Sequence, residues 1–169
     1  MSRTVQTFYK TEQCGIFRGA CCRHMGFHFS PRDFSDISFE SLKAEIETKQ
    51  YISIDWWEGA DGPEYYLRVR NIGGNIVDPS WGGVCVLLTD DGCPLPFEER
   101  PLGARALKPK DTYNSSCESY YTKEDCKNEW KQYTDILKEL VDYFWYYLIK
   151  RPGLNAWSFI FTRKLQVML

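Results

Sequence analysis

The sequence predicts an α+β fold with a small antiparallel sheet, a long C-terminal helix and a cysteine-ligated metal site. Two β-rich segments around a turn predict the sheet, a helical repeat of apolar residues predicts the helix, and seven cysteines in three places predict the site. At 169 residues the chain is long enough to bury a core as one domain. No internal repeat and no linker rich in Pro, Gly or Ser divides it. We therefore expect a single metal-binding domain over residues 1–169.

The central part of the chain contains the segments expected to form strands. Residues 51–57 (YISIDWW) and 64–72 (EYYLRVRNI) carry many β-favouring side chains with partial alternation, and GADGP between them supplies turn residues. They predict paired strands. Residues 83–95 (GVCVLLTDDGCPL) join an apolar run to an Asp-Gly turn signal and a short return, which predicts a second hairpin.

Two segments have helical periodicity. Between residues 30 and 50, possible capping residues precede apolar side chains spaced three and four apart; the caps are Ser30, Ser35, Asp36 or Ser38, and the apolar residues are Phe39, Leu42 and Ile46. Thr122 with Asp125 resembles a capping box for the longer helix, which should end before Pro152. Its apolar face consists of Trp130, Tyr133, Leu137, Leu140, Val141, Phe144 and Leu148. Residues 156–169 have strand character, with a terminal helical turn as the alternative.

Composition restricts the compartment and the class of partner. The formal charge of -2 and the rich supply of Trp, Tyr and Phe argue against a disordered tail and against a protein that coats nucleic acid electrostatically. The first residues lack the apolar run of a signal peptide, and no segment approaches the roughly 20 apolar residues that cross a bilayer. We therefore expect a cytoplasmic protein with no membrane contact. Thiols stay reduced in that compartment, so the cysteines predict metal ligands or buried apolar groups.

The cysteines lie in three places that are far apart in sequence. Cys14, Cys21 and Cys22 precede the first predicted helix, Cys85 and Cys93 flank the Asp-Gly turn, and Cys117 and Cys126 lie at the start of the long helix. A thiolate cluster suits zinc or an iron–sulfur centre. The spacings Cys14 to Cys21 and Cys85 to Cys93 are wider than the two to four residues usual in a zinc knuckle. From the residues alone, metal ligation and buried thiols both remain open.

Several sequence blocks resemble a bacterial family of zinc- or iron-chelating cysteine-cluster domains, to which flagellin lysine N-methylases are related. The blocks are Cys14 with Gly19, Cys21, Cys22 and Arg23, then SPRDF at 30–34, CVLLTDDGCPL at 85–95 and EERPLGAR at 98–105. In the family the first block carries one more cysteine, and the last reads R-P-x-x-C-R. This chain has Arg18 and Ala104 at those two positions.

The resemblance implies a closed, structural metal site. The five remaining family positions are the predicted ligands: Cys14, Cys21, Cys22, Cys85 and Cys93. They imply zinc held by thiolates, with an iron–sulfur cluster as the alternative, and they would tie the N-terminal segment to the 83–95 region. Outside the resemblance, Cys117 and Cys126 are interpreted as core thiols, with a second site or a disulfide as alternatives. His24 and His28 are further candidate ligands, with ordinary surface or hydrogen-bonded histidines as the alternative.

The sequence offers little for an enzyme. It contains no G-x-G-x-x-G or P-loop, only two histidines, and no nucleophile motif around a serine. Asp90 with Asp91 and Glu98 with Glu99 are interpreted as solvated carboxylates. We therefore predict a non-catalytic, zinc-stabilised protein that acts by binding another protein, for example as an inhibitor of a larger enzyme such as a bacterial defence (CRISPR) nuclease. The alternatives are an iron–sulfur redox or methyl-transfer enzyme, and a thiol-rich protein without metal.

Aromatic and basic side chains predict how such a partner would be bound. The aromatic residues come in adjacent groups that one face of a helix or strand cannot bury entirely, so some of them should be exposed: Trp56, Trp57, Tyr65, Tyr66, Tyr120, Tyr121, Trp145, Tyr146 and Tyr147. A basic rim is expected from Arg68, Arg70, Arg100, Arg105, Lys108 and Lys110, with solvated surface as the alternative. The predicted partner is another protein, or a second copy of the chain, and nucleic acid is not expected as the primary partner.

Overall fold

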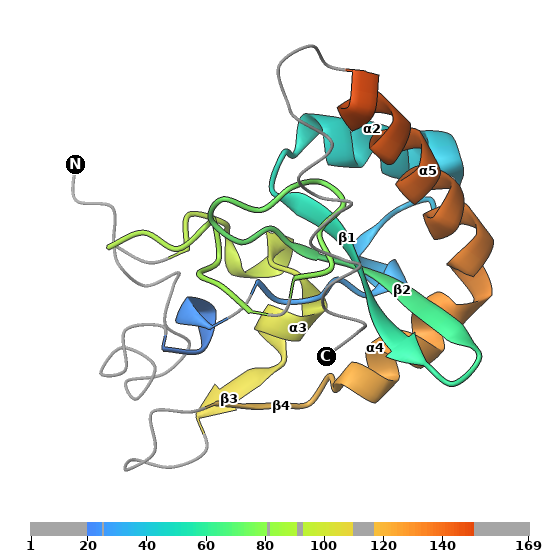
Figure 1. Cartoon of the computed structure of the whole chain (residues 1–169). Coiled ribbons are helices and arrows are strands. Elements are labelled where there is room, and N and C mark those ends of the chain that lie inside the picture. The colour runs from blue at the N-terminus through green and yellow to red at the C-terminus, as the bar shows by residue number, and fades with distance from the viewer. Residues whose placement is uncertain (1–19, 25, 81, 91–92, 110–116, 151–169) are drawn as a thin grey trace, which may run out of the picture.

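The protein has an α+β fold in which a two-stranded hairpin lies between a helical layer and an irregular region (Figure 1). The computed structural model describes residues 20–24, 26–80, 82–90, 93–109 and 117–150. The helices and strands of these residues are α2 (Phe39–Thr48), β1 (Ile52–Gly59), β2 (Gly62–Val69), α3 (Leu102–Arg105), β3 (Leu107–Pro109), β4 (Cys117–Ser119), α4 (Lys123–Trp130) and α5 (Thr134–Lys150).

The central hairpin joins β1 and β2 in antiparallel register, from Ile52 opposite Val69 to Gly59 opposite Gly62. Both of its edges are covered by further chain. Residues 27–29 pair with β2 through the bonds from Phe29 N to Leu67 O (2.8 Å) and from Val69 N to Phe27 O (2.9 Å). Residues 76–78 run beside β1, where Ile54 bridges to Val77 in parallel orientation. The hairpin is therefore the centre of a wider, irregular sheet whose edges are not open.

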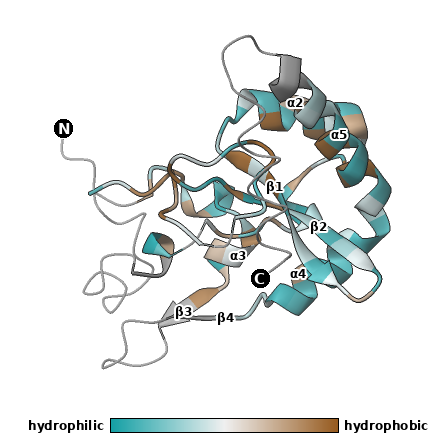
Figure 2. Ribbon diagram, viewed as in Figure 1, coloured by the Kyte–Doolittle hydropathy of each residue, from teal (hydrophilic) through white to brown (hydrophobic). Residues whose placement is uncertain are grey.

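The helical layer begins at the predicted capping box. The Thr122 side chain accepts from Asp125 N while the Asp125 carboxylate accepts from Thr122 N, which satisfies donors at the start of α4. The long helix is interrupted by a three-residue 3-10 turn, Lys131–Tyr133, before α5 continues. In Figure 1, α5 lies beside α2, and Figure 2 shows hydrophobic and hydrophilic residues alternating along α5. The apolar stripe faces the hairpin and α2, as the periodicity predicts.

The core lies between the helices and the hairpin. Leu42 and Ile46 of α2, Ile52 and Ile54 of β1, and Leu137 and Leu140 of α5 are completely buried. Trp130 also reaches across the core, and its indole Nε1 donates to Phe29 O at 2.8 Å. This bond ties the end of α4 to the 27–29 segment. The helical layer and the segment that pairs with β2 are therefore joined by a buried hydrogen bond.

Other predicted elements have different outcomes. Helix α2 begins after Ser38, one of the four predicted caps, whose side chain accepts from Ser41 N. The hairpin predicted at 83–95 is not formed by the described residues: the apolar run pairs with the chain after β2, where Cys85 bridges to Asn71, and residues 93–95 belong to no strand. The short pair β3–β4 was not predicted. Residues 156–169 lie outside the described residues. Within the described chain, no helix is both long and apolar enough to cross a bilayer.

Candidate functional site

The structure brings two of the three cysteine regions into contact. Cys85 N donates to Cys22 O at 2.9 Å, and two residues away Gly83 N donates to His24 O at 2.8 Å. Residues 22–24 and 83–85 therefore run side by side although they are far apart in sequence. Cys14 lies outside the described residues, and no side chain is described for Cys21.

The Cys85 thiol is buried in this region. Its side chain belongs to the core, and burial raises its pKa above the usual value, with the nearby Cys93 acting in the same direction. Without a metal ion, this thiol is therefore protonated at neutral pH. Among the described residues, no three or more His, Cys, Asp or Glu side chains form a group that could hold a metal ion. Cys22, Cys85 and Cys93 thus do not complete a site, and a full ligand set would need Cys14 or Cys21.

Cys126 belongs to a different part of the molecule. It is completely buried on α4, its Sγ lies 3.7 Å from Phe29 O, and burial raises its pKa to about 12. This is the environment of a core thiol, as the sequence interpretation has it. The side chain of Cys117, in β4, is not described.

The sequence blocks 30–34 and 98–105 meet at one carboxylate. Asp33 of the SPRDF block accepts from Ser30 N at 2.9 Å and from Leu102 N at 2.8 Å through the same oxygen, and its other oxygen pairs with Arg105. Leu102 and Arg105 belong to the block at 98–105. Next to this contact, Gly103 N donates to His28 O at 3.1 Å. The Asp33 carboxylate therefore holds α3 against residues 28–33.

A cavity of about 390 Å³ lies beside this contact, between the 27–29 segment, the hairpin and α4. His28 and Arg68 face each other across a bridge between the 27–29 segment and β2. Trp57 and Tyr66 come from opposite strands, and their rings stack with centroids 3.7 Å apart and planes inclined by 7°. Lys123, the first residue of α4, places its ammonium 4.7 Å from the centre of the Trp57 ring. His24 and, from the chain after β2, Asn71, Ser80 and Gly82 complete the cavity wall, which is therefore built from segments that are far apart in sequence.

A buried ion-pair network forms one side of the cavity. Asp55 Oδ2 accepts from Arg68 Nε at 2.6 Å and from the Tyr66 hydroxyl at 2.8 Å, while Asp55 Oδ1 accepts from Trp56 N at 2.7 Å. Burial raises the pKa of Asp55, and Arg68 opposes that rise. Burial, with the Asp55 charge added to it, also raises the pKa of Tyr66 far above its usual value. Arg68 donates further to Asp78 O at 2.9 Å, so its charge is held on several sides.

His28 differs from the other buried polar groups of the cavity because its hydrogen bonding is incomplete. Its side chain is surrounded by Trp57, Tyr66 and Tyr121, with ring centroids 6.0 to 6.1 Å away. Burial lowers its pKa to about 4, so the imidazole is neutral at pH 7. Its Nδ1 atom is buried and has no hydrogen-bond partner among the described residues. The sequence marks His28 only as a candidate metal ligand, and no signal in it indicates the aromatic surroundings.

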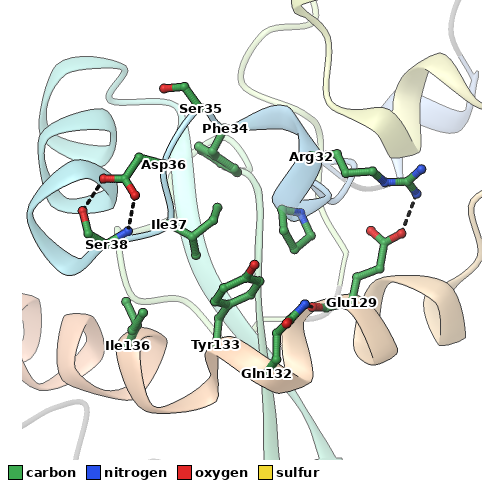
Figure 3. Close-up of a pocket in the computed structure, with 11 residues that line it drawn as sticks. Arg32, Phe34, Ser35, Asp36, Ile37, Ser38, Glu129, Gln132, Tyr133 and Ile136 are labelled. Atoms are coloured by element: carbon green, nitrogen blue, oxygen red, sulfur yellow. Dashed lines mark hydrogen bonds and ion pairs between the residues drawn. The ribbon is translucent and has the colours of Figure 1, made fainter.

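A second, shallower cavity lies on the outer side of α4 and α5 (Figure 3). The 31–38 segment forms one wall, and Glu129, Tyr133 and Ile136 form the other. Figure 3 shows the Arg32 guanidinium reaching across to the Glu129 carboxylate at one end, with apolar side chains farther along. Because Glu129 also accepts from the Ser30 and Tyr121 hydroxyls, this end of the groove is held by a polar network. The groove thus combines an ion pair with an apolar floor.

The predicted binding surface is only partly present. Arg68 and Arg100 are buried, with 2% and 7% of their surface exposed, and Arg105 pairs with Asp33, so the interpretation of these residues as a basic rim is wrong. Arg70 is half-buried and donates to Ile52 O. The Lys108 side chain and Lys110 are not described. The cause is the covered hairpin, which turns strand arginines inward to meet carboxylates and carbonyl groups.

The adjacent aromatic residues divide unequally between core and surface. Tyr120 and Tyr146 are exposed, at 62% and 60%, whereas Tyr121 is buried. Trp56 and Trp57 are both buried, because chain packs on both faces of the hairpin. Tyr66 is buried, and Tyr65 and Trp145 pack partly against the core. The side chain of Tyr147 is not described.

No protein-family model matches this chain, and neither does any curated protein or solved structure. The geometry of the molecule is therefore the basis of the functional argument.

Proposed function

We propose that this protein is a non-catalytic metal-binding protein in which cysteines of the N-terminal segment and of the 85–93 region hold a structural zinc ion. The observation that carries the proposal is the backbone bond between Cys22 and Cys85, because it places two predicted ligand regions side by side. The nearby Cys93 would add a third thiol. Cys14 or Cys21 would supply the fourth thiolate, and with four thiolates filling a tetrahedral sphere the site would be closed.

Zinc would stabilise the contact between the two cysteine regions. The Cys85 thiol is buried and protonated without metal, and coordination to a cation would make the thiolate the favoured form. The ion would fasten the 20–24 segment to the 83–85 segment, which a few backbone hydrogen bonds now join. Because a preformed site is absent from an unfolded chain, metal binding would add directly to the stability of the fold.

Metal content and colour test this proposal. Protein purified without chelator is expected to contain about one zinc ion per chain and to absorb no visible light. Cys22→Ser and Cys85→Ser should lose the metal. Cys126→Ala is the matched control: it removes a buried thiol that lies on α4 and outside the proposed site, and it should retain the metal.

Two results would overturn the zinc proposal. A folded wild-type protein without metal would show that the cysteines are core thiols only. Brown protein containing iron and sulfide would favour the alternative, an iron–sulfur redox or methyl-transfer protein. Circular dichroism of each variant separates loss of metal from loss of fold.

The proposed action is binding to another protein, with enzyme inhibition as one form of it. Exposed aromatic side chains support this part, since Tyr120 and Tyr146 present more than half of their surface to solvent. A second copy of the chain is the simplest partner to test. Sedimentation over a hundredfold range of protein concentration should reveal a dimer that Tyr120→Ser or Tyr146→Ser weakens, and a monomer throughout would exclude self-association.

A further inference from the structure

The cavity around His28 has the dimensions and the wall of a small-molecule site. Its volume of about 390 Å³ lies near the lower end of the range for pockets that take small organic molecules. The rings of Trp57, Tyr66 and His28 contribute flat apolar surface, and Asp55 and Arg68 contribute polar groups. An apolar wall with a few positioned polar groups is typical of ligand pockets.

The buried charges of the cavity wall are already paired inside the protein, whereas the Lys123 ammonium is exposed and lies over the Trp57 ring. Arg68 pairs with Asp55 at 2.6 Å and with Asp78 at 3.3 Å, and the Arg68 and Asp55 side chains are almost completely buried. An ionic ligand would lose its hydration in this cavity without meeting an unmatched buried charge of opposite sign. The electrostatics therefore favour an uncharged ligand.

The aromatic side chains favour a planar ligand. Trp57 and Tyr66 stack in parallel, and the His28 ring stands nearly perpendicular to both, at interplanar angles of 76° and 81°. Flat rings can add to such an arrangement in an offset-stacked or edge-to-face position. Lys123 covers the Trp57 ring from α4, where a long flexible side chain can move when a ligand enters.

The remaining hydrogen-bonding capacity belongs to His28. Only 8% of this residue is exposed, it lines the cavity, and its Nδ1 has no hydrogen-bond partner in the described part of the chain. By contrast, Asn71 in the same wall is satisfied, since its Oδ1 accepts from Gly26 N and its Nδ2 donates to Gly82 O. A neutral imidazole has one donor and one acceptor nitrogen, so a ligand group that both donates and accepts can bond to either tautomer. Because Nδ1 is itself buried, the His28 ring must turn for a ligand to reach this atom.

We propose that this cavity binds an uncharged planar nitrogen heterocycle of the purine or pyrimidine base class, with His28 as its hydrogen-bonding partner. Such a ring has donor and acceptor groups side by side, fits flat against aromatic surface and carries no charge. None of the predicted cysteine ligands lines the cavity, and the proposal requires His28 to be free of metal.

Nuclear magnetic resonance of the histidine rings tests the proposal directly. The chain contains only two histidines, so ring-¹⁵N labelling yields two sets of signals, which His24→Gln assigns. The probes are hypoxanthine and uracil, with benzoate and benzamidine as planar charged comparisons. We expect at least one base to shift the His28 nitrogens saturably, with a dissociation constant at least tenfold lower than that of either charged compound.

Two variants separate a hydrogen bond from simple filling of the cavity. His28→Phe retains a planar ring and removes both nitrogens, and it should weaken base binding at least fivefold. His28→Gln restores a donor and an acceptor and should recover part of the affinity. Saturation-transfer spectra of the ligand provide the readout in both variants, and circular dichroism reports their fold.

The wild-type titration decides the question even if neither variant folds. No saturable His28 shift with either base would overturn the proposal. An equal response to benzoate or benzamidine would also overturn it, because balanced charge would then not determine the choice of ligand. Unchanged base affinity in a folded His28→Phe protein would show that His28 is not the partner.

Discussion

The buried, neutral state of His28 predicts a loss of stability in mild acid. The pKa of His28 is about 4 in the folded protein and 6.5 in the unfolded chain. As the pH falls, His28 therefore takes up a proton in the unfolded chain at a higher pH than in the folded protein. The contribution of the neutral imidazole to the free energy of unfolding is intact above pH 6.5 and is lost as the pH falls toward 4. A difference of about 2.5 pH units, at about 1.4 kcal/mol per unit, corresponds to about 3.5 kcal/mol in full. About 2 kcal/mol of it should be lost between pH 7 and pH 5.

The assay is urea unfolding at pH 7, 6 and 5, followed by circular dichroism. Carboxylates also titrate in acid, so the quantity of interest is the difference in unfolding free energy between wild type and His28→Phe, which cannot take up the proton. We expect this difference to move by about 2 kcal/mol against the wild type between pH 7 and pH 5. His24→Gln, which changes an exposed histidine, is the matched control and should follow the wild type.

No described neighbour of His28 in the cavity is available to balance the charge of a protonated imidazole. The rings around it come from Trp57, Tyr66 and Tyr121, and the charged side chains that share its cavity are Asp55, Arg68 and Lys123. Asp55 is already paired with Arg68, so an imidazolium would be buried without a carboxylate of its own. A wild-type to His28→Phe difference that stays constant within about 0.5 kcal/mol from pH 7 to pH 5 would refute this reasoning.

Three other perturbations follow from the structure. Asp55→Asn should lower the free energy of unfolding by about 3 kcal/mol, because Arg68 keeps its charge and loses its closest carboxylate counter-charge. Glu40→Gln, in an exposed pair, should lower it by less than about 1 kcal/mol, and similar values for the two variants in urea unfolding would contradict this reasoning. Gly26→Ala would place a Cβ 1.9 Å from Val69 O, so unfolding should show a loss of about 3 kcal/mol, and a change below about 1 kcal/mol would be inconsistent with the close approach. If zinc fastens residues 20–24 to 83–85, a chelator should lower the midpoint of thermal unfolding, whereas an unchanged midpoint after verified metal removal would exclude a stabilising ion.

Local sequence signals predicted the main elements of the fold well. The 51–57 and 64–72 segments form the antiparallel pair β1–β2, Ser38 caps α2, and Thr122 with Asp125 forms the capping box of α4. Each of these signals acts within a few residues, through backbone propensity, turn residues or one side-chain cap. Such interactions depend mainly on neighbours along the chain, which is why they can be recognised in a single sequence.

The errors arose where distant segments compete for the same backbone. Residues 70–72 bond to 84–86, so the apolar run at 83–95 does not fold back on itself. Chain on both faces of the hairpin buries Trp56 and Trp57 together and directs Arg68 toward Asp55. Alternation along one strand identifies two faces, but it does not tell whether the second face is covered.

Sequence reasoning could recognise one of the two candidate sites and not the other. The cysteine regions were recognisable in the sequence, and the contact between Cys22 and Cys85 is a property of the fold. The His28 cavity had no sequence signal, because its members come from the 27–29 segment, both strands of the hairpin and the start of α4.

The sequence by itself therefore determined the α+β class, the central hairpin, the capping box of α4 and the positions of the thiols. Only the tertiary structure decided which thiol regions meet, which arginines are buried, and that His28 is neutral among aromatic rings with an unsatisfied nitrogen. The physical reason is that propensity and capping depend on neighbours along the chain, whereas burial, charge pairing and cavity shape depend on neighbours in space.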